Sequence, residues 1–264
     1  MKALALDTST DACTVALGVG DEVLVDHRVE RRAHARLLLP MVEALLAEAG
    51  LSLRDLDGIA FGRGPGGFTG VRIAVAAAQG LALGADVGTV GVSTLGAIAQ
   101  GCLAELGDRR VRVVVDARMG ELYVGEYLAA EGLAGGRPDG AADGPGGPAG
   151  AVVALVGAEA VVAPEAAGIG GAPSDATFAG SGIERYPEAF ARVPPARLRP
   201  GRLPHARDVL ALARARIEAG SLDDPADAAP VYLRDRVALT EAERGVGPGR
   251  AAGVGAPGAT SGTP

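Results

Sequence analysis

The sequence predicts an α/β fold with a partly parallel sheet and two similar lobes. Apolar segments of strand length alternate with segments of helical period over residues 1–106. The order apolar strand, Asp, short turn, strand occurs at 4–19 and returns at 111–128. The hydrophobic fraction of 48% allows a buried core, and the aromatic fraction of only 3% means that aliphatic side chains must build it.

The N-terminal lobe is predicted over residues 1–107. Its expected strands are 3–6, 13–19, 22–28, 58–62 and 87–92, and its expected helices are about 33–49, 68–83 and 94–106. Ser93 or Thr94 is the expected cap of the third helix.

The C-terminal lobe is predicted over residues 108–240. It begins with strands at 111–115 and 122–128, and a flexible insertion rich in Gly, Ala and Pro follows at about 129–150. The remaining expected elements are a short strand and helix at 151–162, a strand and turn at 177–182, a helix at 206–218 and a last ordered segment at 230–234. Residues 241–264 are predicted to be a disordered tail, because they carry too few apolar side chains to offset the entropy of ordering.

The bulk properties restrict the classes of function. The formal net charge of −7 gives no overall attraction to nucleic acid, although a local basic patch stays open. Cys13 and Cys102 lack CxxC spacing and are expected to be buried, reduced thiols. The N-terminus lacks the apolar region of a signal peptide, and no run approaches the ~18 apolar residues of a membrane span. We therefore expect a cytoplasmic protein that does not enter a membrane.

A polar turn of Asp7, Thr8, Ser9 and Thr10 follows the first predicted strand. In phosphate-handling enzymes such a turn presents hydroxyls and backbone N–H groups to phosphate, while the Asp orients a metal-bound water. The alternative is an Asx or ST turn whose side chains bond to their own backbone. Spacing alone leaves both interpretations open.

A glycine-rich loop opens the helix at 68–83. Gly64, Gly66 and Gly67 permit close backbone approach, and Thr69 lies near the helix start, where unpaired N–H groups suit an anion. The spacing matches neither common nucleotide-binding pattern, and the lack of a lysine weighs against tight triphosphate binding. The helix is apolar nearly all round, so we predict that the sheet covers one face and a partner the other; a fully internal helix is the alternative.

No catalytic or metal site is predicted. His27, His34 and His205 form no paired ligand pattern, and no Gly-x-Ser-x-Gly elbow occurs. Arg118, which follows Asp116 in a turn, either binds a polar ligand or pairs at the surface.

Seven segments resemble the TsaB family, also called YeaZ. They lie at 4–13 (Leu-Ala-Leu-Asp-Thr-Ser-Thr-Asp-Ala-Cys), 38–42, 62–73 (Gly-Arg-Gly-Pro-Gly-Gly-Phe-Thr-Gly-Val-Arg-Ile), 79–84, 91–95, 116–121 and 230–234. The resemblance implies a two-lobed actin-like ATPase or sugar-kinase fold of the ribonuclease H-like kind. It also implies a role in making threonylcarbamoyladenosine beside the anticodon of tRNA.

In that family TsaB is the non-catalytic partner of the transferase TsaD, and the ATPase TsaE joins the same complex. The resemblance implies a TsaD heterodimer, or a homodimer when the chain is alone, formed through the helices at 33–49 and 68–83. It also implies that tRNA is reached only through the complex and that no cofactor is tightly bound, with ATP or ADP a candidate at a partner interface. The predicted interface residues are Leu38, Met41, Val42, Leu45, Phe68, Arg72 and Val75. The predicted anion- or nucleotide-binding residues are Asp7, Thr8, Ser9, Thr10, Gly64, Gly66, Gly67, Thr69 and Arg118.

One departure from TsaD separates the hypotheses. TsaD-like relatives carry a metal-binding His-x-x-x-His where this chain has Thr94 and Ile98, which cannot replace imidazole ligands. We therefore expect a scaffold subunit. An ATP-dependent kinase or hydrolase of the sugar-kinase class is the alternative, suggested by the turn at 7–10, Asp116 and the glycine loop, and a metallopeptidase is a third hypothesis.

Overall fold

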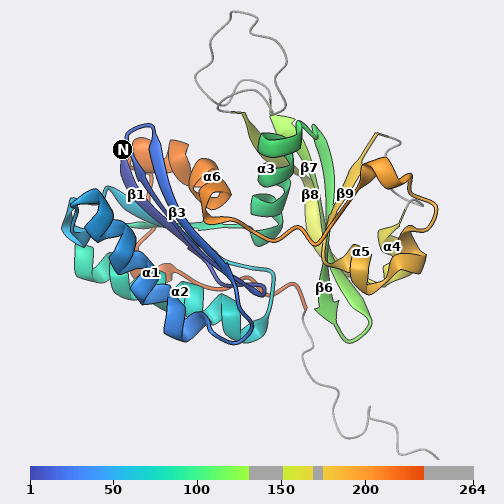
Figure 1. Ribbon diagram of the computed structural model, residues 1–264, viewed down its shortest axis with the longest axis horizontal. Coiled ribbons are helices and arrows are strands. Elements are labelled where there is room, and N and C mark those ends of the chain that lie inside the picture. The colour runs from blue at the N-terminus through green and yellow to red at the C-terminus, as the bar shows by residue number, and fades with distance from the viewer. Residues whose placement is uncertain (131–150, 169–174, 235–264) are drawn as a thin grey trace, which may run out of the picture. The chain divides into compact units, whose positions relative to one another are not determined.

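Two five-stranded sheets organise the residues that the computed structural model describes, which are 1–130, 151–168 and 175–234 (Figure 1). Met1–Leu233 form one unit, so the predicted lobe boundary at 107/108 stays a prediction. The predicted tail at 241–264 lies outside the described residues, as does the predicted insertion from 131 to 150.

The first sheet has the strand order β3-β2-β1-β4-β5. Strands β1, β2 and β3 form an antiparallel meander, and β4 and β5 add in parallel on the other side of β1. The bounds are β1 Lys2–Asp7, β2 Ala12–Val19, β3 Glu22–Val29, β4 Gly58–Gly62 and β5 Thr89–Val92. Strands β1, β2 and β4 are buried on both faces, which explains why the sequence shows them as continuous apolar runs.

Helices cover both faces of this sheet. Helices α1 (His34–Ala49) and α2 (Phe68–Ala85) pack on Leu4 and Leu6, while α6 (Ala206–Glu218) packs on the opposite face, against Ala3 and Ala5. The alternation arises because successive strand residues point to opposite faces. Helix α6 thus packs on the first sheet, although it follows the second sheet in sequence. The sequence places residues 206–218 in the predicted C-terminal lobe at 108–240.

The second sheet repeats the topology of the first. Its order is β10-β9-β6-β7-β8, with an antiparallel meander from β6 to β8 and parallel strands β9 and β10 on the other side of β6. The bounds are β6 Arg110–Arg118, β7 Glu121–Ala130, β8 Val152–Val162, β9 Thr177–Gly180 and β10 Leu198–Pro200. Where a short strand and helix were predicted at 151–162, β8 is one long strand; short helices α4 (Pro164–Ala167) and α5 (Gly182–Arg185) follow later.

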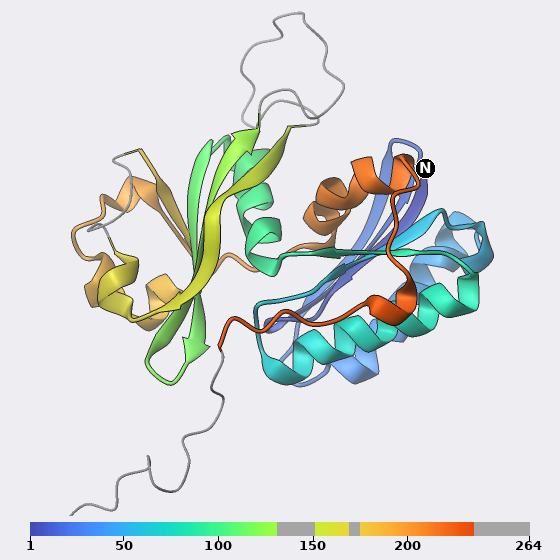
Figure 2. The same cartoon turned by 180° about the vertical axis from the view of Figure 1, so that it is seen from behind.

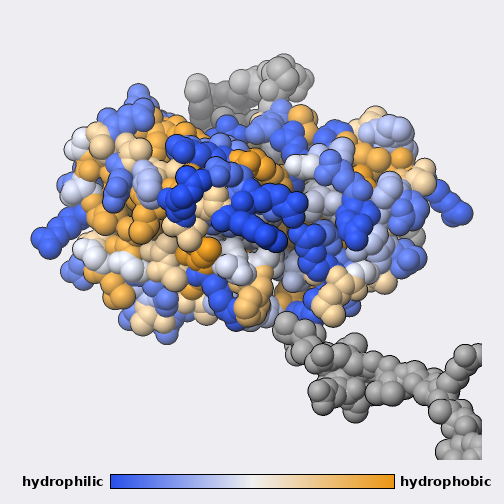
Figure 3. All heavy atoms as spheres, turned by 60° about the horizontal axis from the view of Figure 1, so that its bottom comes forward, coloured by the Kyte–Doolittle hydropathy of each residue, from blue (hydrophilic) through white to orange (hydrophobic). Residues whose placement is uncertain are grey.

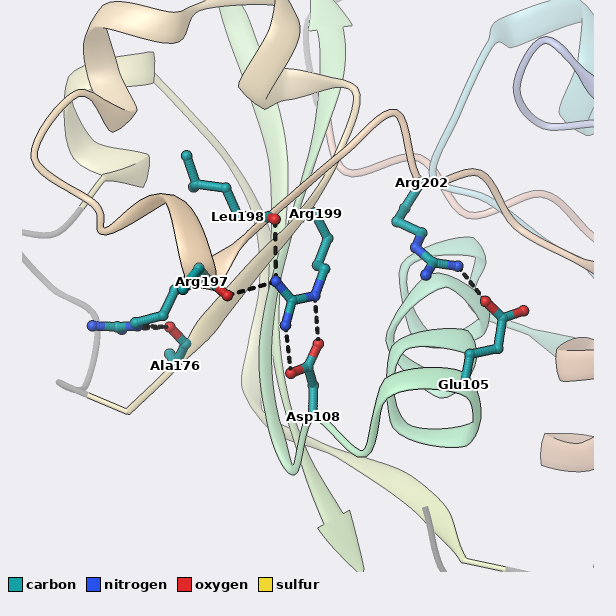
Figure 4. A network of polar contacts seen from close by, with 8 residues as sticks. Glu105, Asp108, Ala176, Arg197, Leu198, Arg199 and Arg202 are labelled. Atoms are coloured by element: carbon teal, nitrogen blue, oxygen red, sulfur yellow. Dashed lines mark hydrogen bonds and ion pairs between the residues drawn. The ribbon is translucent and has the colours of Figure 1, made fainter. Parts of the chain in front are cut away.

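Helix α3 (Thr94–Leu106) packs on the second sheet and contacts α6. Ser93 caps it as predicted, since its Oγ accepts the backbone N–H groups of Leu95 and Gly96. Near the C-terminal end of α3, arginines from residues 197–202 form hydrogen bonds and ion pairs with carbonyl and carboxylate oxygens (Figure 4). Arg199 Nε and Nη2 each lie 3.1 Å from an oxygen of Asp108, and Arg202 Nη1 lies 2.5 Å from Glu105 Oε2. The Arg202–Glu105 pair attaches the connection between β10 and α6 to α3, and the Arg199–Asp108 pair attaches β10 to the segment that follows α3.

Two further sequence expectations can be compared with the structure. Cys13 and Cys102 are buried and free, as predicted, and burial raises their thiol pKa values to about 11 and about 12. Among the described residues, α2 is the one helix that is long and apolar enough, by length and composition, to cross a membrane. Core helices meet the same criterion, and Ala74 and Ala78 of α2 are buried against the first sheet.

Candidate functional site

The polar turn after β1 satisfies its own hydrogen bonds. Asp7 Oδ1 accepts from the backbone N–H of Ser9 at 2.7 Å and from the Ser9 hydroxyl at 2.6 Å. The hydroxyl of Thr94 lies 3.1 Å from Asp7 Oδ2 and 2.9 Å from Ser9 Oγ. Burial raises the pKa of the Asp7 carboxyl, and the hydrogen bonds from Ser9 oppose that shift. The geometry is that of an Asx turn locked to the start of α3.

The glycine loop packs directly on this turn. The N–H of Gly67 donates to the Ser9 carbonyl at 2.7 Å, and the Thr8 hydroxyl donates to the Gly70 carbonyl at 2.7 Å. A Cβ atom on Gly66 would lie 2.4 Å from the Ser9 carbonyl oxygen, and one on Gly70 would lie 2.0 Å from that of Thr8. Gly66 and Gly70 are therefore required for close backbone contact between the loop and the turn.

The structure brings the predicted anion-binding residues of the polar turn and the glycine loop together, but they differ in exposure and Arg118 lies apart from them. Asp7, Thr8 and Ser9 are buried, whereas Gly67 and Thr69 are exposed at the start of α2; Gly64 is buried, and Thr10 and Gly66 are half-buried. Arg118 lies elsewhere, in the hairpin between β6 and β7, where its guanidinium is 3.0 Å from the Asp116 carboxylate. The nucleotide-binding assignment stays a prediction, and the inward hydrogen bonds favour the structural interpretation of the turn.

Most of the predicted interface side chains lie inside the chain. Each of five is at most 5% exposed and belongs to the core between α1, α2 and the first sheet; they are Leu38, Met41, Val42, Leu45 and Val75. Phe68 and Arg72 are exposed. The helical period that drew attention to these leucines and valines marks the face that packs on the sheet. A partner can therefore contact only the opposite faces of α1 and α2.

That outer surface consists mainly of small and isolated apolar residues. Leu39 of α1 is 48% exposed and Leu83 of α2 is 66% exposed. Helix α2 also exposes Ala76, Gly80 and Gly84 at intervals of four residues, which places them in one row on the helix. Figure 3, with the side that carries α1 and α2 turned forward, shows hydrophobic patches among hydrophilic residues on its left half. We call this row, with Leu39 and Leu83, the outer helix surface.

A second polar cluster has no counterpart in the predictions. The Tyr127 hydroxyl lies 3.2 Å from Ser93 Oγ, and both hydroxyls contact the Glu159 carboxylate. Burial and the Glu159 charge raise the pKa of Tyr127. Ser93 was recognised only as a cap, because nothing in the sequence links it to residues on β7 and β8.

Comparisons with known proteins agree with this architecture. Residues 27–242 match a family model described as TsaD, tRNA N6-adenosine threonylcarbamoyltransferase. A solved structure named YeaZ, from Pseudomonas aeruginosa, is 40% identical with a TM-score of 0.74, covering 88% of this chain and 99% of that one. Another, from the same organism and described as uncharacterized with similarity to peptidase YEAZ, is 41% identical with a TM-score of 0.76, at the same coverage.

Curated relatives match over a shorter stretch. The tRNA threonylcarbamoyladenosine biosynthesis protein TsaB of Escherichia coli is 50% identical over 127 residues, which are 48% of this chain and 55% of that protein. The protein of the same name from Haemophilus influenzae is 46% identical over 125 residues, 47% of this chain and 53% of that protein. The chain thus spans about half the length of the curated relatives that it matches.

Proposed function

The chain belongs to the TsaB (YeaZ) family, and on this premise we propose that it is a scaffold subunit of the complex that makes threonylcarbamoyladenosine in tRNA. In this proposal it binds the transferase TsaD through the outer helix surface, activates it and helps to recruit TsaE. Alone, it forms a homodimer through the same surface. It acts in the cytoplasm, without a membrane.

The observation that carries the proposal is the chemistry of the outer helix surface. Ala76, Gly80 and Gly84 project little beyond the α2 backbone, so a partner helix can approach closely. Leu39 on α1 and Leu83 on α2 supply exposed apolar area. A non-catalytic role is supported by the inward-facing Asp7 and by Thr94, whose hydroxyl is engaged with Asp7 and Ser9.

The kinase or hydrolase alternative depends on the same turn. Its Asp7 carboxylate is fully buried, and three of its acceptor sites are already engaged by Ser9 and Thr94. ATP or ADP at a partner interface stays compatible with the scaffold role, because the exposed start of α2 at Gly67 and Thr69 remains available to a partner.

Gly80→Arg tests the scaffold proposal without disturbing the chain itself. A Cβ on Gly80 meets nothing within 4 Å, and replacing a helical glycine adds up to about 1 kcal/mol of helix stability. We expect the variant to fold, to fail to co-sediment with TsaD and to lose tRNA modification in the reconstituted system.

The matched control is Ala215→Arg, at an exposed position of α6 on the other face of the sheet. It should leave both assembly and modification unchanged. The proposal is wrong if Gly80→Arg assembles with TsaD and supports modification as the unaltered chain does.

A further inference from the structure

Two aromatic rings and an arginine from distant parts of the chain meet at the start of α2. The guanidinium carbon of Arg72 lies 3.3 Å from the ring centroid of Phe68 and 5.3 Å from that of Tyr232. The two ring centroids are 6.2 Å apart, with their planes tilted by 33°. We call these three residues the aromatic–arginine cluster.

The segment that carries Tyr232 runs along α2 (Figure 2), and hydrogen bonds tie it to α2 and to the glycine loop. The N–H of Val231 donates to the Arg63 carbonyl at 2.8 Å, and Gln79 Nε2 donates to the Ala228 carbonyl at 3.1 Å. The fold therefore places the backbone of Tyr232 next to the start of α2.

The cluster faces solvent although its rings are apolar. Phe68 is 57% exposed and Tyr232 is 48% exposed. Among the described residues, neither Arg72 nor the neighbouring exposed Arg63 has a carboxylate partner in an ion pair. Other arginines do form such ion pairs, as Arg199 does with Asp108. The Arg72 guanidinium beside two exposed rings, with Arg63 in backbone contact with the neighbouring Val231, suits a ligand that offers both negative charge and flat apolar faces.

Local charge points the same way. From residue 58 to residue 85 the sequence contains Arg63 and Arg72 and no acidic side chain, within a chain whose net charge is −7. The segment 228–233 adds no charge. The sequence at the start of α2 is thus cationic within an acidic protein. Positive charge there suits a polyanionic ligand.

We propose that Phe68, Arg72 and Tyr232 stack unpaired bases of RNA, while Arg63 neutralises an adjoining phosphate. Single-stranded RNA is recognised by stacking of splayed bases on aromatic rings and guanidinium planes, with cationic side chains along the backbone. The inference rests on the proposed function, in which tRNA is the substrate of the complex. It reassigns Phe68 and Arg72, which begin the same row of exposed α2 residues, from a protein interface to tRNA contact, and it leaves the row from Ala76 onward to the protein partner.

The test is a titration of a fluorescently labelled, single-stranded RNA of anticodon-loop sequence with the full chain in complex with TsaD, followed by anisotropy. Phe68→Ala and Tyr232→Ala should each weaken binding roughly tenfold or more, because each removes a stacking surface. Tyr232→Phe keeps the ring and should bind as the unaltered chain does. Arg63→Gln should reduce the slope of log affinity against log salt by about 0.7.

Sedimentation of the same variants with TsaD separates this inference from the proposed function. Intact assembly together with weakened RNA binding supports it. Unchanged RNA affinity in Phe68→Ala and Tyr232→Ala, or no binding of the single strand by the unaltered complex, overturns it and leaves the scaffold role standing. Loss of assembly in these variants also overturns it, because the cluster would then be part of the protein interface.

Discussion

Two buried aspartates, Asp7 and Asp208, differ in the groups that contact their carboxylates. Asp7 receives hydrogen bonds from Ser9 and Thr94. Asp208, on the face of α6 that meets α3, lies at a long ion-pair distance of 3.9 Å from Arg207 Nε. Burial raises the pKa of Asp208 to about 7, and Arg207 opposes that shift only in part. Burial thus raises the pKa of both carboxyls, but the Asp208 carboxylate has the weaker local contacts.

The raised pKa of Asp208 predicts a specific pH dependence of stability. Between about pH 4 and pH 7 the unfolded chain has released this proton and the folded chain retains it. The folded state then binds more protons, so the free energy of unfolding falls as pH rises through this window, by on the order of a few kcal/mol, and levels off above it. Asp208→Asn should remove this contribution, which denaturant titrations across the pH range would measure.

Asp86→Asn is the control for this effect. Asp86 is an exposed residue that ends α2 in a left-handed conformation, which Asn adopts readily. It should retain the slope of the unaltered chain. An unchanged slope in Asp208→Asn would show that Asp208 is ionised in the folded state.

Two glycines of α2 should respond in opposite directions to alanine. A Cβ on Gly70 would lie 2.0 Å from the Thr8 carbonyl oxygen, so Gly70→Ala must push the glycine loop away from the polar turn. We expect a loss of about 2 kcal/mol or more in the free energy of unfolding. Gly80→Ala meets nothing within 4 Å and should gain about 1 kcal/mol. Chemical denaturation measures both, and equal effects would contradict the close contact at Gly70.

At the scale of elements, periodicity located the helices but not their outer faces. The predicted helices at 33–49, 68–83 and 206–218 correspond to α1, α2 and α6 within two residues. Large apolar residues repeat on the helix faces that pack on the sheet. The predicted interface residues Met41 and Val75 belong to these buried faces. The face left for a partner is made of small residues such as Gly80, whose hydropathy carries little signal.

The candidate sites were predictable only in parts. The polar turn and the glycine loop were each recognisable, because glycines and an Asp-Thr-Ser-Thr run are local signals. Their mutual contact was not, since it depends on β1 pairing in parallel with β4 and placing Asp7 beside Gly62. Tyr232 joins Phe68 and Arg72 from the other end of the chain, a juxtaposition that no local pattern contains.

At the scale of the whole chain, α3 is the element that connects the duplicated sheets. Its buried side chains, Leu95, Ile98 and Leu103 among them, pack on the second sheet. Its first residue reaches the first sheet, because the Thr94 N–H donates to the Gly64 carbonyl at 2.9 Å and its hydroxyl contacts Asp7. A substitution inside α3 should therefore lower the stability of both sheets.

Leu95→Ala tests this coupling. The fully buried side chain leaves a cavity, so we expect a loss of about 2–5 kcal/mol in the free energy of unfolding. Because Met1–Leu233 form one unit, amide hydrogen exchange should accelerate in β1 and β4 by as much as in β6 and β9. Leu106→Ala, at the exposed end of the same helix, should change neither sheet appreciably. Faster exchange confined to the second sheet would mean that the sheets unfold separately, and that α3 joins them without coupling their stability.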